Sequence, residues 1–303
     1  MSLSILIPVY NRDVTLLVSS LAKLIAQEKI VSEIILLDDA SEPDIDLLNS
    51  KLAEGGFIYY FRNQTNLGRE NTRKLLAQKA NYSHLLFLDC DVKIANPDFI
   101  AKYAEQVKMN TAVCIGGLLY DEERPDQCKY KLHWKYGRER ETKVNSGDGI
   151  FLSSNFLMQK DLFLNLSLDI NLTQYGHEDT LIGIELKKRE IPILSVDAPV
   201  VHEGLEENSV FIKKSLHAVE NLIVLEEIAG PDLLTEHIRL YRWYKRLSSL
   251  YLNEFIEKLE ALFHKLVMKN LHSCNPGLKY FDWMRLAHFI RLKKLQEKEK
   301  VNQ

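Results

Sequence analysis

Two aspartates separated by one residue, Asp89 and Asp91, follow the apolar run of residues 85–88. A short apolar run bounded by polar residues predicts a buried strand, so both carboxylates would leave the sheet at its edge. Carboxylate oxygens suit Mg²⁺ or Mn²⁺, ions that bind diphosphates while keeping other coordination positions open. Such an ion would neutralise the charge on a departing diphosphate. The same pattern occurs in phosphatases with an aspartyl nucleophile and in ordinary turns, so the motif alone leaves the metal role open.

A second acidic pair, Glu178 and Asp179, follows Gly176 and His177 at the start of an amphipathic helical pattern that runs to residue 188. Acidic residues in a first helical turn commonly act as caps and favour the helix dipole. The alternative is catalytic, because transfer to a hydroxyl needs a carboxylate base that faces the anomeric carbon, opposite the leaving diphosphate. Both interpretations remain open from the residues alone.

A histidine, His202, ends the largely apolar run of residues 195–201. A histidine in this position is more often structural than metal-binding, and taken alone it favours the structural interpretation. Its value as a candidate ligand therefore depends on what the other signals indicate together.

The elements that must position these residues alternate between short β-rich runs and helical stretches up to about residue 119. The runs predict strands at 3–9, 34–37, 57–61, 84–88 and 112–115, and helices at 13–27, 69–80 and 97–108. Alternation of this kind predicts a parallel sheet covered by helices on both faces. Ligands of such sheets bind at the carboxyl ends of the strands. Polar residues follow four of these ends, which predicts a site there: Asn11, Asp38, Asp39, Asn63, Asp89 and Asp91.

The rest of the chain changes character twice. Residues 120–149 are polar and charged, and we interpret them as a long excursion that serves either as a lid or acceptor-binding flap, or as a plain surface hairpin. From residue 209 the pattern is helical throughout, which predicts a domain boundary between 1–208 and 209–303. An apolar line from Leu240 to Leu266 has a mean step of 26/7, about 3.7 residues, which predicts a helix packed on a globular body rather than a coiled-coil rod.

The last part of the helical extension combines aromatic and basic residues over 280–294. One interpretation is a helix that lies on an anionic membrane where lipid-linked acceptors reside. The other, which we favour, is packing against the catalytic body or a twin subunit.

Composition excludes several classes of protein. A formal net charge of −3 argues against a nucleic-acid binder, which needs a basic face. No apolar run approaches the roughly 18 residues of a membrane-spanning helix, and the N-terminus has no basic leader. We therefore expect a cytoplasmic protein, peripheral to the inner face of the membrane if it touches lipid. The four scattered cysteines are then expected to be reduced thiols: Cys90, Cys114, Cys128 and Cys274.

Seven motifs in order along residues 3–203 resemble family 2 glycosyltransferases with the GT-A fold. They are the opening strand of residues 4–12, Asp38-Asp39 with residues 40–41, the N-x-G element of Asn66 and Gly68 with Arg69, the D-x-D of Asp89 and Asp91, the small-residue segment 153–155, the G-x-E-D of residues 176–179, and His202. The usual Ala-Arg-Asn run after the glycine is altered here. The resemblance implies an α/β fold with a Rossmann-like mixed sheet flanked by helices, followed by the all-helical extension.

The resemblance also implies a role for each matching residue. Asp39 would bind the nucleobase, Asp38 would orient the neighbouring strand end, and Asp89 would contact ribose or sugar hydroxyls. Asp91 would ligate Mn²⁺ or Mg²⁺ with His202 as a second protein ligand, and Asp179 would be the general base. The remaining assignments are donor contacts from Pro8, Tyr10, Arg12, Asn66, Gly68, Arg69 and Arg73, and acceptor contacts from Asn155, His177 and Glu178. For the two arginines a solvent-facing position on their helix is the alternative.

The implied activity is transfer of a sugar, with inversion, from a nucleoside-diphosphate sugar to a hydroxyl. UDP is the nucleotide expected of the family, and the acceptor would be a saccharide or a lipid-linked saccharide, as in polysaccharide biosynthesis. Two alternatives are weighed beside it: a non-catalytic nucleotide- or sugar-binding module of the same fold, and an aspartyl-nucleophile phosphatase. The phosphatase is disfavoured because such folds place the nucleophile on the first strand.

Overall fold

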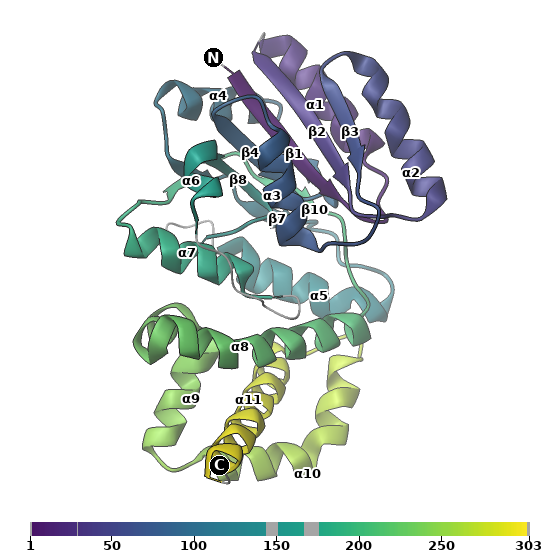
Figure 1. Ribbon diagram of the computed structural model, residues 1–303. Helices are drawn as coiled ribbons and strands as arrows, with labels where there is room; N and C mark the ends of the chain where they lie inside the picture. The colour runs from purple at the N-terminus through teal and green to yellow at the C-terminus, as the bar shows by residue number, and fades with distance from the viewer. Residues whose placement is uncertain (1, 29, 144–150, 167–175, 302–303) are drawn as a thin grey trace. The chain divides into compact units, whose positions relative to one another are not determined.

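The computed structural model describes residues 2–28, 30–143, 151–166 and 176–301. The chain divides into two compact units, which are described separately (Figure 1). The first comprises Met1–Asp121, Arg140–Ser167 and Glu185–Gly204, and the second comprises Glu122–Glu139, Leu168–Ile184 and Leu205–Gln303. The domain boundary at 208/209 stays a prediction, although the described residues from Asn208 to Val301 are mainly helical.

The first unit is built on a mixed sheet of seven strands in the order β3-β2-β1-β4-β8-β6-β9. Strands β1, β2, β3 and β4 run parallel, as the alternating pattern predicts, and β8 pairs antiparallel with both β4 and β6. The apolar runs of β1, β2 and β4 are buried, which is typical of strands covered on both faces. The strands are β1 (Ser2–Val9), β2 (Val31–Asp38), β3 (Ile58–Arg62), β4 (His84–Leu88), β6 (Val113–Ile115), β8 (Asn155–Gln159) and β9 (Leu194–Ser195).

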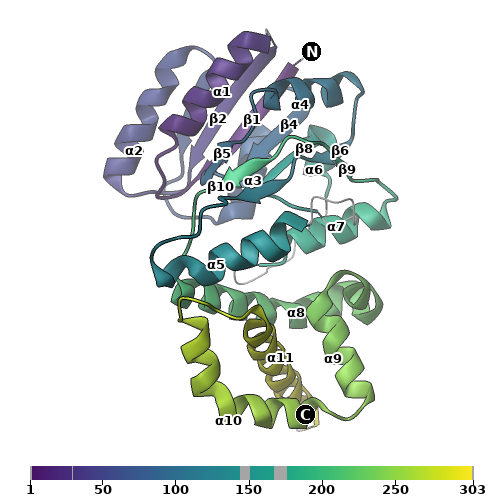
Figure 2. The ribbon, with the colours of Figure 1, turned by 180° about the vertical axis from the view of Figure 1, so that it is seen from behind.

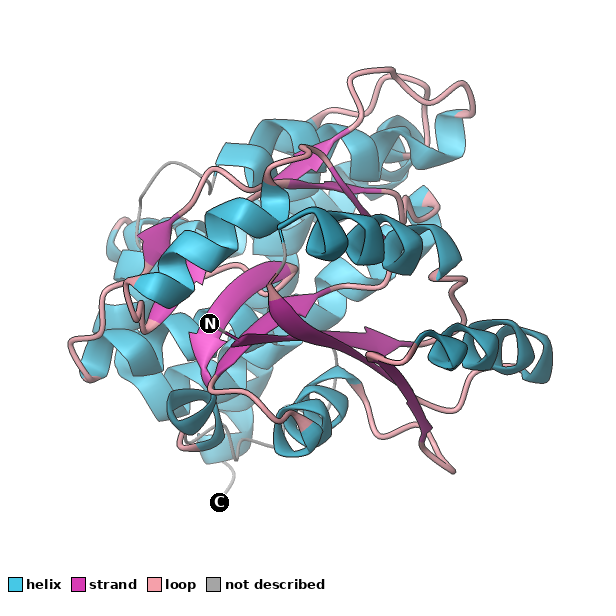
Figure 3. Ribbon diagram, turned by 90° about the horizontal axis from the view of Figure 1, so that it is seen from above, coloured by secondary structure: helices cyan, strands magenta, loops and turns pink. Residues whose placement is uncertain are grey.

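Helices cover both faces of this sheet. Figures 1 and 2 show α3 and α6 over one face, and α1 with α4 over the other. The view from above in Figure 3 shows the sheet between these layers. The helices are α1 (Thr15–Glu28), α2 (Pro43–Ser50), α3 (Arg69–Lys79), α4 (Phe99–Lys108) and α6 (Lys160–Leu164), with a 3₁₀ turn at Lys51–Gly55. The predicted strands and helices of residues 3–115 are confirmed within a few residues at each end.

A smaller sheet brings distant segments of the first unit together. Strand β10 (Val200–His202) pairs antiparallel with β5 (Val92–Ile94) and parallel with β7 (Leu118–Tyr120). In this register His202 lies opposite Val92, the residue after Asp91. The pairing places the end of the late apolar run beside the acidic motif, 111 residues earlier in the chain.

The second unit is helical, with α8 (Asn208–His237), α9 (Arg239–Ser249), α10 (Asn253–Leu271) and α11 (Leu278–Val301). Helix α8 is kinked at Gly230, which has φ 78°, and at Pro231, which has no N–H to donate. Two apolar clusters fill the unit. One contains Val219, Leu222, Leu225, Tyr241 and Phe289, and the other contains Leu132, Phe211, Val267, Leu271 and Phe281.

Two expectations about the helical extension are corrected. The apolar line from Leu240 to Leu266 is not one helix, because the chain turns at residues 250–252 between α9 and α10. The hypothesis that residues 280–294 lie on a membrane is wrong for their apolar side chains, because Phe281, Met284, Phe289 and Ile290 of α11 are buried inside the second unit. These side chains pack within the helical unit itself, and the favoured alternative, packing against the catalytic body or a twin subunit, stays a prediction.

The excursion of residues 120–149 is helical from Cys128 to Glu141. It contains a 3₁₀ turn (Cys128–Tyr130), α5 (Lys131–Tyr136) and a π-helical turn (Gly137–Glu141), while residues 144–150 lie outside the described part. Leu132 is buried, and the ring of His133 stacks on Phe211 of α8. The surface-hairpin interpretation is therefore wrong, and a role as lid or acceptor flap stays a prediction.

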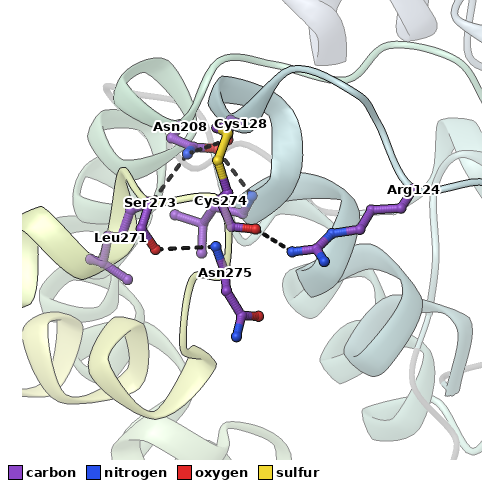
Figure 4. The surroundings of a disulfide bond; sticks show 8 residues. Arg124, Cys128, Asn208, Leu271, Ser273, Cys274 and Asn275 are labelled. Atoms are coloured by element: carbon purple, nitrogen blue, oxygen red, sulfur yellow. Dashed lines mark hydrogen bonds between the residues drawn. A yellow bond between two sulfur atoms is a disulfide. The ribbon is translucent and has the colours of Figure 1, made fainter.

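The expectation of four reduced thiols is also wrong, because Cys128 and Cys274 form a disulfide within the second unit (Figure 4). Their Cα atoms are 4.4 Å apart, although 146 positions separate them in sequence. The buried side chain of Asn208 holds the same place: its amide donates to the carbonyls of Cys128 and Leu271 and accepts from the N–H of Leu132. Cys90 and Cys114 are free thiols.

Among the residues that the structure describes, none of the helices has both the length and the apolar character that crossing a membrane requires.

Candidate active site

The buried carboxylate of Asp39 fixes the loop that follows β3. One oxygen accepts from the Asn63 side chain at 2.8 Å and from the Leu67 N–H at 2.9 Å, and the other accepts from the Gly68 N–H at 2.9 Å. Asn66 also accepts from the Gly68 N–H, at 3.1 Å. Gly68 has φ 83°, a conformation that favours glycine, and α3 begins at the next residue. Asp39 thus shapes the N-terminus of α3, and its contact with a nucleobase stays a prediction.

The neighbouring Asp38 holds the turn after β2. One of its oxygens accepts from the Ser41 N–H at 2.7 Å, while its Oδ2 is buried with no hydrogen-bond partner. Ser41 in turn accepts from the N–H of Asn11, and Asn11 accepts from the N–H of Glu42. The ends of β1 and β2 are therefore tied to one another, with left-handed residues at Asn11 (φ 48°) and Ala40 (φ 66°). Left-handed backbone is rare for residues other than glycine. Where it does occur, it is often at a functional site.

Two arginines hold Asp89. The guanidinium of Arg69 donates to both carboxylate oxygens, at 2.7 and 2.5 Å, and that of Arg73 donates to one of them at 2.9 Å. Arg73 is 1% exposed and also donates to the carbonyl of Ser153 at 2.6 Å and to Glu70 at 3.1 Å. Both arginines belong to the inner face of α3, so the solvent-facing alternative is wrong for Arg73. Asp89 is thereby fixed at the end of β4.

The second aspartate of the motif faces His202. An oxygen of Asp91 lies 3.7 Å from Nδ1 of His202, and the carbonyl of Asp91 accepts from the Glu203 N–H at 2.8 Å. The chain passes so close at Gly204 that a Cβ there would lie 2.3 Å from the other Asp91 oxygen. Asp91 and His202 are therefore held side by side by β5 and β10, as two ligands of one ion would be.

The first strand ends near the segment that follows His202. Tyr10 is about half exposed, Pro8 pairs with Leu37 in the sheet, and the side chain of Arg12 lies 3.9 Å from Glu203. Burial raises the pKa of the Cys90 thiol to about 12, with Asp91 adding to the shift. Cys90 is therefore a neutral thiol between the two aspartates.

Asn155 is buried, and its side chain supports the sheet. Its carbonyl accepts from the Tyr103 hydroxyl at 2.7 Å, and its amide donates to the carbonyls of Ala198 at 2.8 Å and Gly117 at 3.1 Å. A Cβ at Gly116 would collide with this network. These contacts explain Asn155 as a structural residue and leave its predicted contact with an acceptor without support.

The Gly176–Asp179 segment belongs to the second unit and opens α7 (Glu178–Lys188). Gly176 has φ 118° and approaches Ala218 of α8 so closely that a Cβ would lie 2.6 Å from that residue's own. His177 follows with φ 72°, and its Nε2 is buried without a partner. Burial, assisted by Arg285, lowers the pKa of His177 to about 3, so the ring is neutral.

In this segment Glu178 accepts from the Gly176 N–H at 3.0 Å. Glu178 and Asp179 are therefore the first two residues of α7, and they follow a constrained turn. The roles of His177 and Glu178 toward the acceptor, and of Asp179 as base, stay predictions.

A family model described as glycosyl transferase family 2 matches residues 4–166, more than half of the chain. The chain belongs to this family. Family 2 membership makes the protein a glycosyltransferase with a GT-A fold, and it sets aside the phosphatase and the non-catalytic alternatives. A search of curated protein sequences finds no match to the chain.

Solved structures support the family 2 fold. The mannosyltransferase PcManGT from Pyrobaculum calidifontis, in complex with GDP-Man and Mn²⁺, has a TM-score of 0.53 and 13% identity over 98% of this chain and 87% of its own. GalNAc-T7 with UDP, GalNAc and Mn²⁺ has a TM-score of 0.52 and 21% identity over 74% of this chain. TarS from S. aureus has a TM-score of 0.50 and 16% identity over 98% of this chain. The chain spans about half of the GalNAc-T7 and TarS chains, 48% and 54%.

The residues of this family 2 chain fit a divalent ion that is shared with a substrate. No group of three or more His, Cys, Asp or Glu side chains gathers as a metal site within the described residues. Asp91 and His202 would supply two ligands, and diphosphate oxygens and water would supply the others, as is usual for Mg²⁺ with phosphate substrates. The donor set thus fits an ion that binds together with the nucleotide.

The sequence analysis did not identify Gly204 as a neighbour of Asp91, nor Asp89 as the carboxylate that Arg69 and Arg73 share. The positions of Arg69 and Arg73, four apart on one helix, are a signal that they face the same way. No local pattern marks Gly204, because its importance comes from the close approach of Asp91.

Proposed function

We propose that this glycosyltransferase is metal-dependent and inverting, and that it moves a sugar from a nucleoside-diphosphate donor, with UDP as the expected nucleotide, to a hydroxyl of a saccharide or lipid-linked saccharide. The observation that carries the proposal is the 3.7 Å approach of Asp91 and His202 at the edge where Asp39 and Asp89 also end their strands. Ligands bind at such an edge in open α/β sheets.

In the proposed reaction the acceptor oxygen forms a bond to the anomeric carbon while the bond from that carbon to the diphosphate oxygen breaks. The nucleoside diphosphate leaves with the electron pair, and Asp179 takes the hydroxyl proton. Asp91 and His202 would hold Mn²⁺ or Mg²⁺, which would supply positive charge to the leaving diphosphate. Asp38, Asp39, Pro8, Tyr10 and Arg12 are proposed to surround the nucleoside.

The two arginines of α3 are proposed as a positioning pair. They hold Asp89 in one orientation, in which it would accept hydrogen bonds from donor hydroxyls. Arg69, whose side chain is partly exposed, is proposed to face the donor diphosphate, since guanidinium groups pair well with phosphate. Asn66 and Gly68 would contribute through the loop that Asp39 fixes.

A thermal-shift panel of UDP, GDP, ADP and CDP, each with and without Mn²⁺, tests the donor half of the proposal. One nucleotide is expected to stabilise the protein in the presence of metal, by about 2.7 kcal/mol at a concentration one hundred times its dissociation constant. Asp91→Ala should abolish the metal-dependent shift. The matched control, Asp197→Ala, removes a carboxylate that is 87% exposed and should leave the shift unchanged. A shift that survives in Asp91→Ala would contradict the metal assignment.

The base is tested with the nucleotide sugar that the panel selects. Asp179→Asn should keep the donor-induced thermal shift and lose transfer, because the amide cannot accept the hydroxyl proton. Retained turnover in this variant would remove Asp179 as the base without affecting the donor site.

For location we keep the cytoplasm, with peripheral contact at the inner face of the membrane, as a proposal. The Cys128–Cys274 disulfide argues the other way, because such bonds persist mainly in oxidising compartments. Alkylation of the thiols in freshly lysed cells, followed by mass spectrometry, decides the point. Free Cys128 and Cys274 support a reducing compartment, and a fully oxidised pair contradicts it.

A further inference from the structure

Exposed apolar side chains gather along the outer side of α10 and at the turn before it. Phe255, Leu262 and Leu266 are exposed, and their spacing of seven and four residues places them on one helix face. Glu260, Val267 and Leu271 repeat the same spacing on the opposite face and are buried. Helix α10 therefore has one face packed in the second unit and an outer face that is also apolar. We call Tyr251, Phe255, Leu262 and Leu266 the α10 stripe.

Tyr251, at the start of the stripe, occupies a position that helices usually give to glycine. Helix α9 ends with the Leu252 N–H donating to the Leu247 carbonyl at 3.0 Å and the Tyr251 N–H donating to the Ser248 carbonyl at 3.1 Å. Tyr251 has φ 57°, the left-handed conformation of this capping motif, in which glycine is preferred. It is also 94% exposed. The stability of the turn does not explain a tyrosine here, which points to a role for its side chain outside the unit.

Basic residues flank the stripe. Lys258, Lys265 and Lys269 are exposed and, at about 100° per residue, lie together along one side of the α10 face that carries Phe255 and Leu262. Residues 239–271 contain seven lysines and arginines against three glutamates, one of which is the buried Glu260. Lysines beside an apolar stripe can lay their stems along it while their ammonium groups reach anionic head groups.

We propose that the α10 stripe and its lysines bind an anionic lipid bilayer, with the apolar side chains entering the head-group region. The complementary charge of the lipid distinguishes this partner from a second copy of the chain. A symmetric antiparallel dimer through the stripe would bring the lysine-bearing sides of the two copies together, and like charges repel. The inference concerns the second unit alone, and it holds or fails independently of the proposed reaction.

Flotation of the full-length protein with vesicles tests the proposal. The protein should float with vesicles of phosphatidylcholine and phosphatidylglycerol, and should stay unbound with phosphatidylcholine alone. Raising the salt from 0.1 to 1 M, which shortens the screening length from about 10 to about 3 Å, should weaken binding. No binding to anionic vesicles, or equal binding to both kinds, would overturn the proposal.

Two variants separate the stripe from the fold. Leu262→Glu/Leu266→Glu places two charges at exposed positions and should weaken vesicle binding about tenfold or more, since each buried apolar group contributes to such binding. Tyr251→Gly should weaken binding while keeping or raising the melting temperature, because glycine suits the left-handed turn. The matched control is Leu16→Glu/Met109→Glu in the first unit, where the two residues are 82% and 64% exposed. Equal loss of binding in this control would overturn the assignment to α10.

Two further readouts complete the test. Sedimentation of the free protein should show the same oligomeric state for wild type and Leu262→Glu/Leu266→Glu, whereas a dimer that this variant dissociates would show that the stripe binds a second copy instead. The metal-dependent nucleotide shift should be unchanged in all these variants. Failure of that shift in the wild type would strike the proposed function and leave the lipid result to stand on its own.

Discussion

The two compact units use charged side chains for different purposes. In the first unit, Arg73 and Asp89 meet at strand ends and shape a site. In the second unit, charges cross-link helices: the buried Glu260 of α10 pairs with Arg291 of α11 at 2.8 Å, and Glu226 of α8 pairs with Lys293 of α11 at 3.0 Å. In the first unit the residues that we propose to bind the donor also make buried contacts that stabilise the fold. In the second unit the exposed stripe can be changed without touching the ion pairs between helices.

The largest expected effect comes from the shared residues of the first unit. Arg73→Met removes the buried guanidinium that Glu70, Asp89 and the Ser153 carbonyl share, and the free energy of unfolding should fall by about 3–5 kcal/mol. Arg69→Met, at a partly exposed position, should cost less. Urea titrations of both variants measure the difference, and equal small losses would show that the site contributes little to stability.

The next effect belongs to the second unit. Cys128→Ser/Cys274→Ser removes a disulfide between positions 146 apart and should lower the free energy of unfolding by about 2–4 kcal/mol. The metal-dependent nucleotide shift should persist, because no donor residue is altered. Reductant should destabilise the wild type and leave the double variant unchanged. Loss of nucleotide binding in the variant would show that the disulfide of the second unit also supports the donor site, contrary to the comparison drawn above.

A smaller effect isolates the metal pair. Gly204→Ala introduces a Cβ that would lie 2.3 Å from an Asp91 oxygen, so the carboxylate must move away from its place beside His202. Mn²⁺ affinity, measured by titration in the presence of nucleotide, should fall about 10–100-fold, as it does when the supports of metal ligands are altered. The melting temperature without ligands should change little. Unchanged affinity would show that Asp91 has room to adjust.

The smallest effect, taken over one pH unit, is a pH dependence in the second unit. The folded pKa of His177 is about 3, below its usual 6.5, so between these values the unfolded chain binds a proton that the folded chain does not. Stability is therefore lost as pH falls from 6.5, by about 1.4 kcal/mol per pH unit from this group. His177→Asn keeps a residue that tolerates φ 72° and should flatten the slope. An identical slope in wild type and variant would contradict the assignment.

The sequence predicted the parts of the first unit that depend on local pattern. The apolar runs at 3–9, 34–37 and 84–88 identify buried strands, and their polar ends therefore identify the edge where Asp39, Asp89 and Asp91 lie. Strand β8 was not among the predicted strands. The apolar run of residues 156–158 is short, and nothing in it indicates that the strand runs antiparallel to its neighbours. The link from Arg73 to Ser153 depends on that strand and was equally invisible.

In the second unit the local pattern misled twice. The apolar line from Leu240 to Leu266 continues through residues 250–252. A glycine at the left-handed position would have indicated the turn, but this position is occupied by Tyr251. The spacing of Cys128 and Cys274 gives no sign of a disulfide, because 146 positions separate them and only the tertiary packing of the second unit brings them together. The amphipathic appearance of residues 280–294 fits both a membrane helix and the packed helix that α11 is.

The disulfide makes a covalent ring of residues 128–274, and that ring contains β8 and β10 of the first unit as well as most of the second. A protease that cuts the backbone once inside the ring separates no fragment, so Asn155 and His202 stay joined to the rest of the chain. Electrophoresis without reductant would therefore show nicked protein at full length, and fragments would separate after the bond is broken.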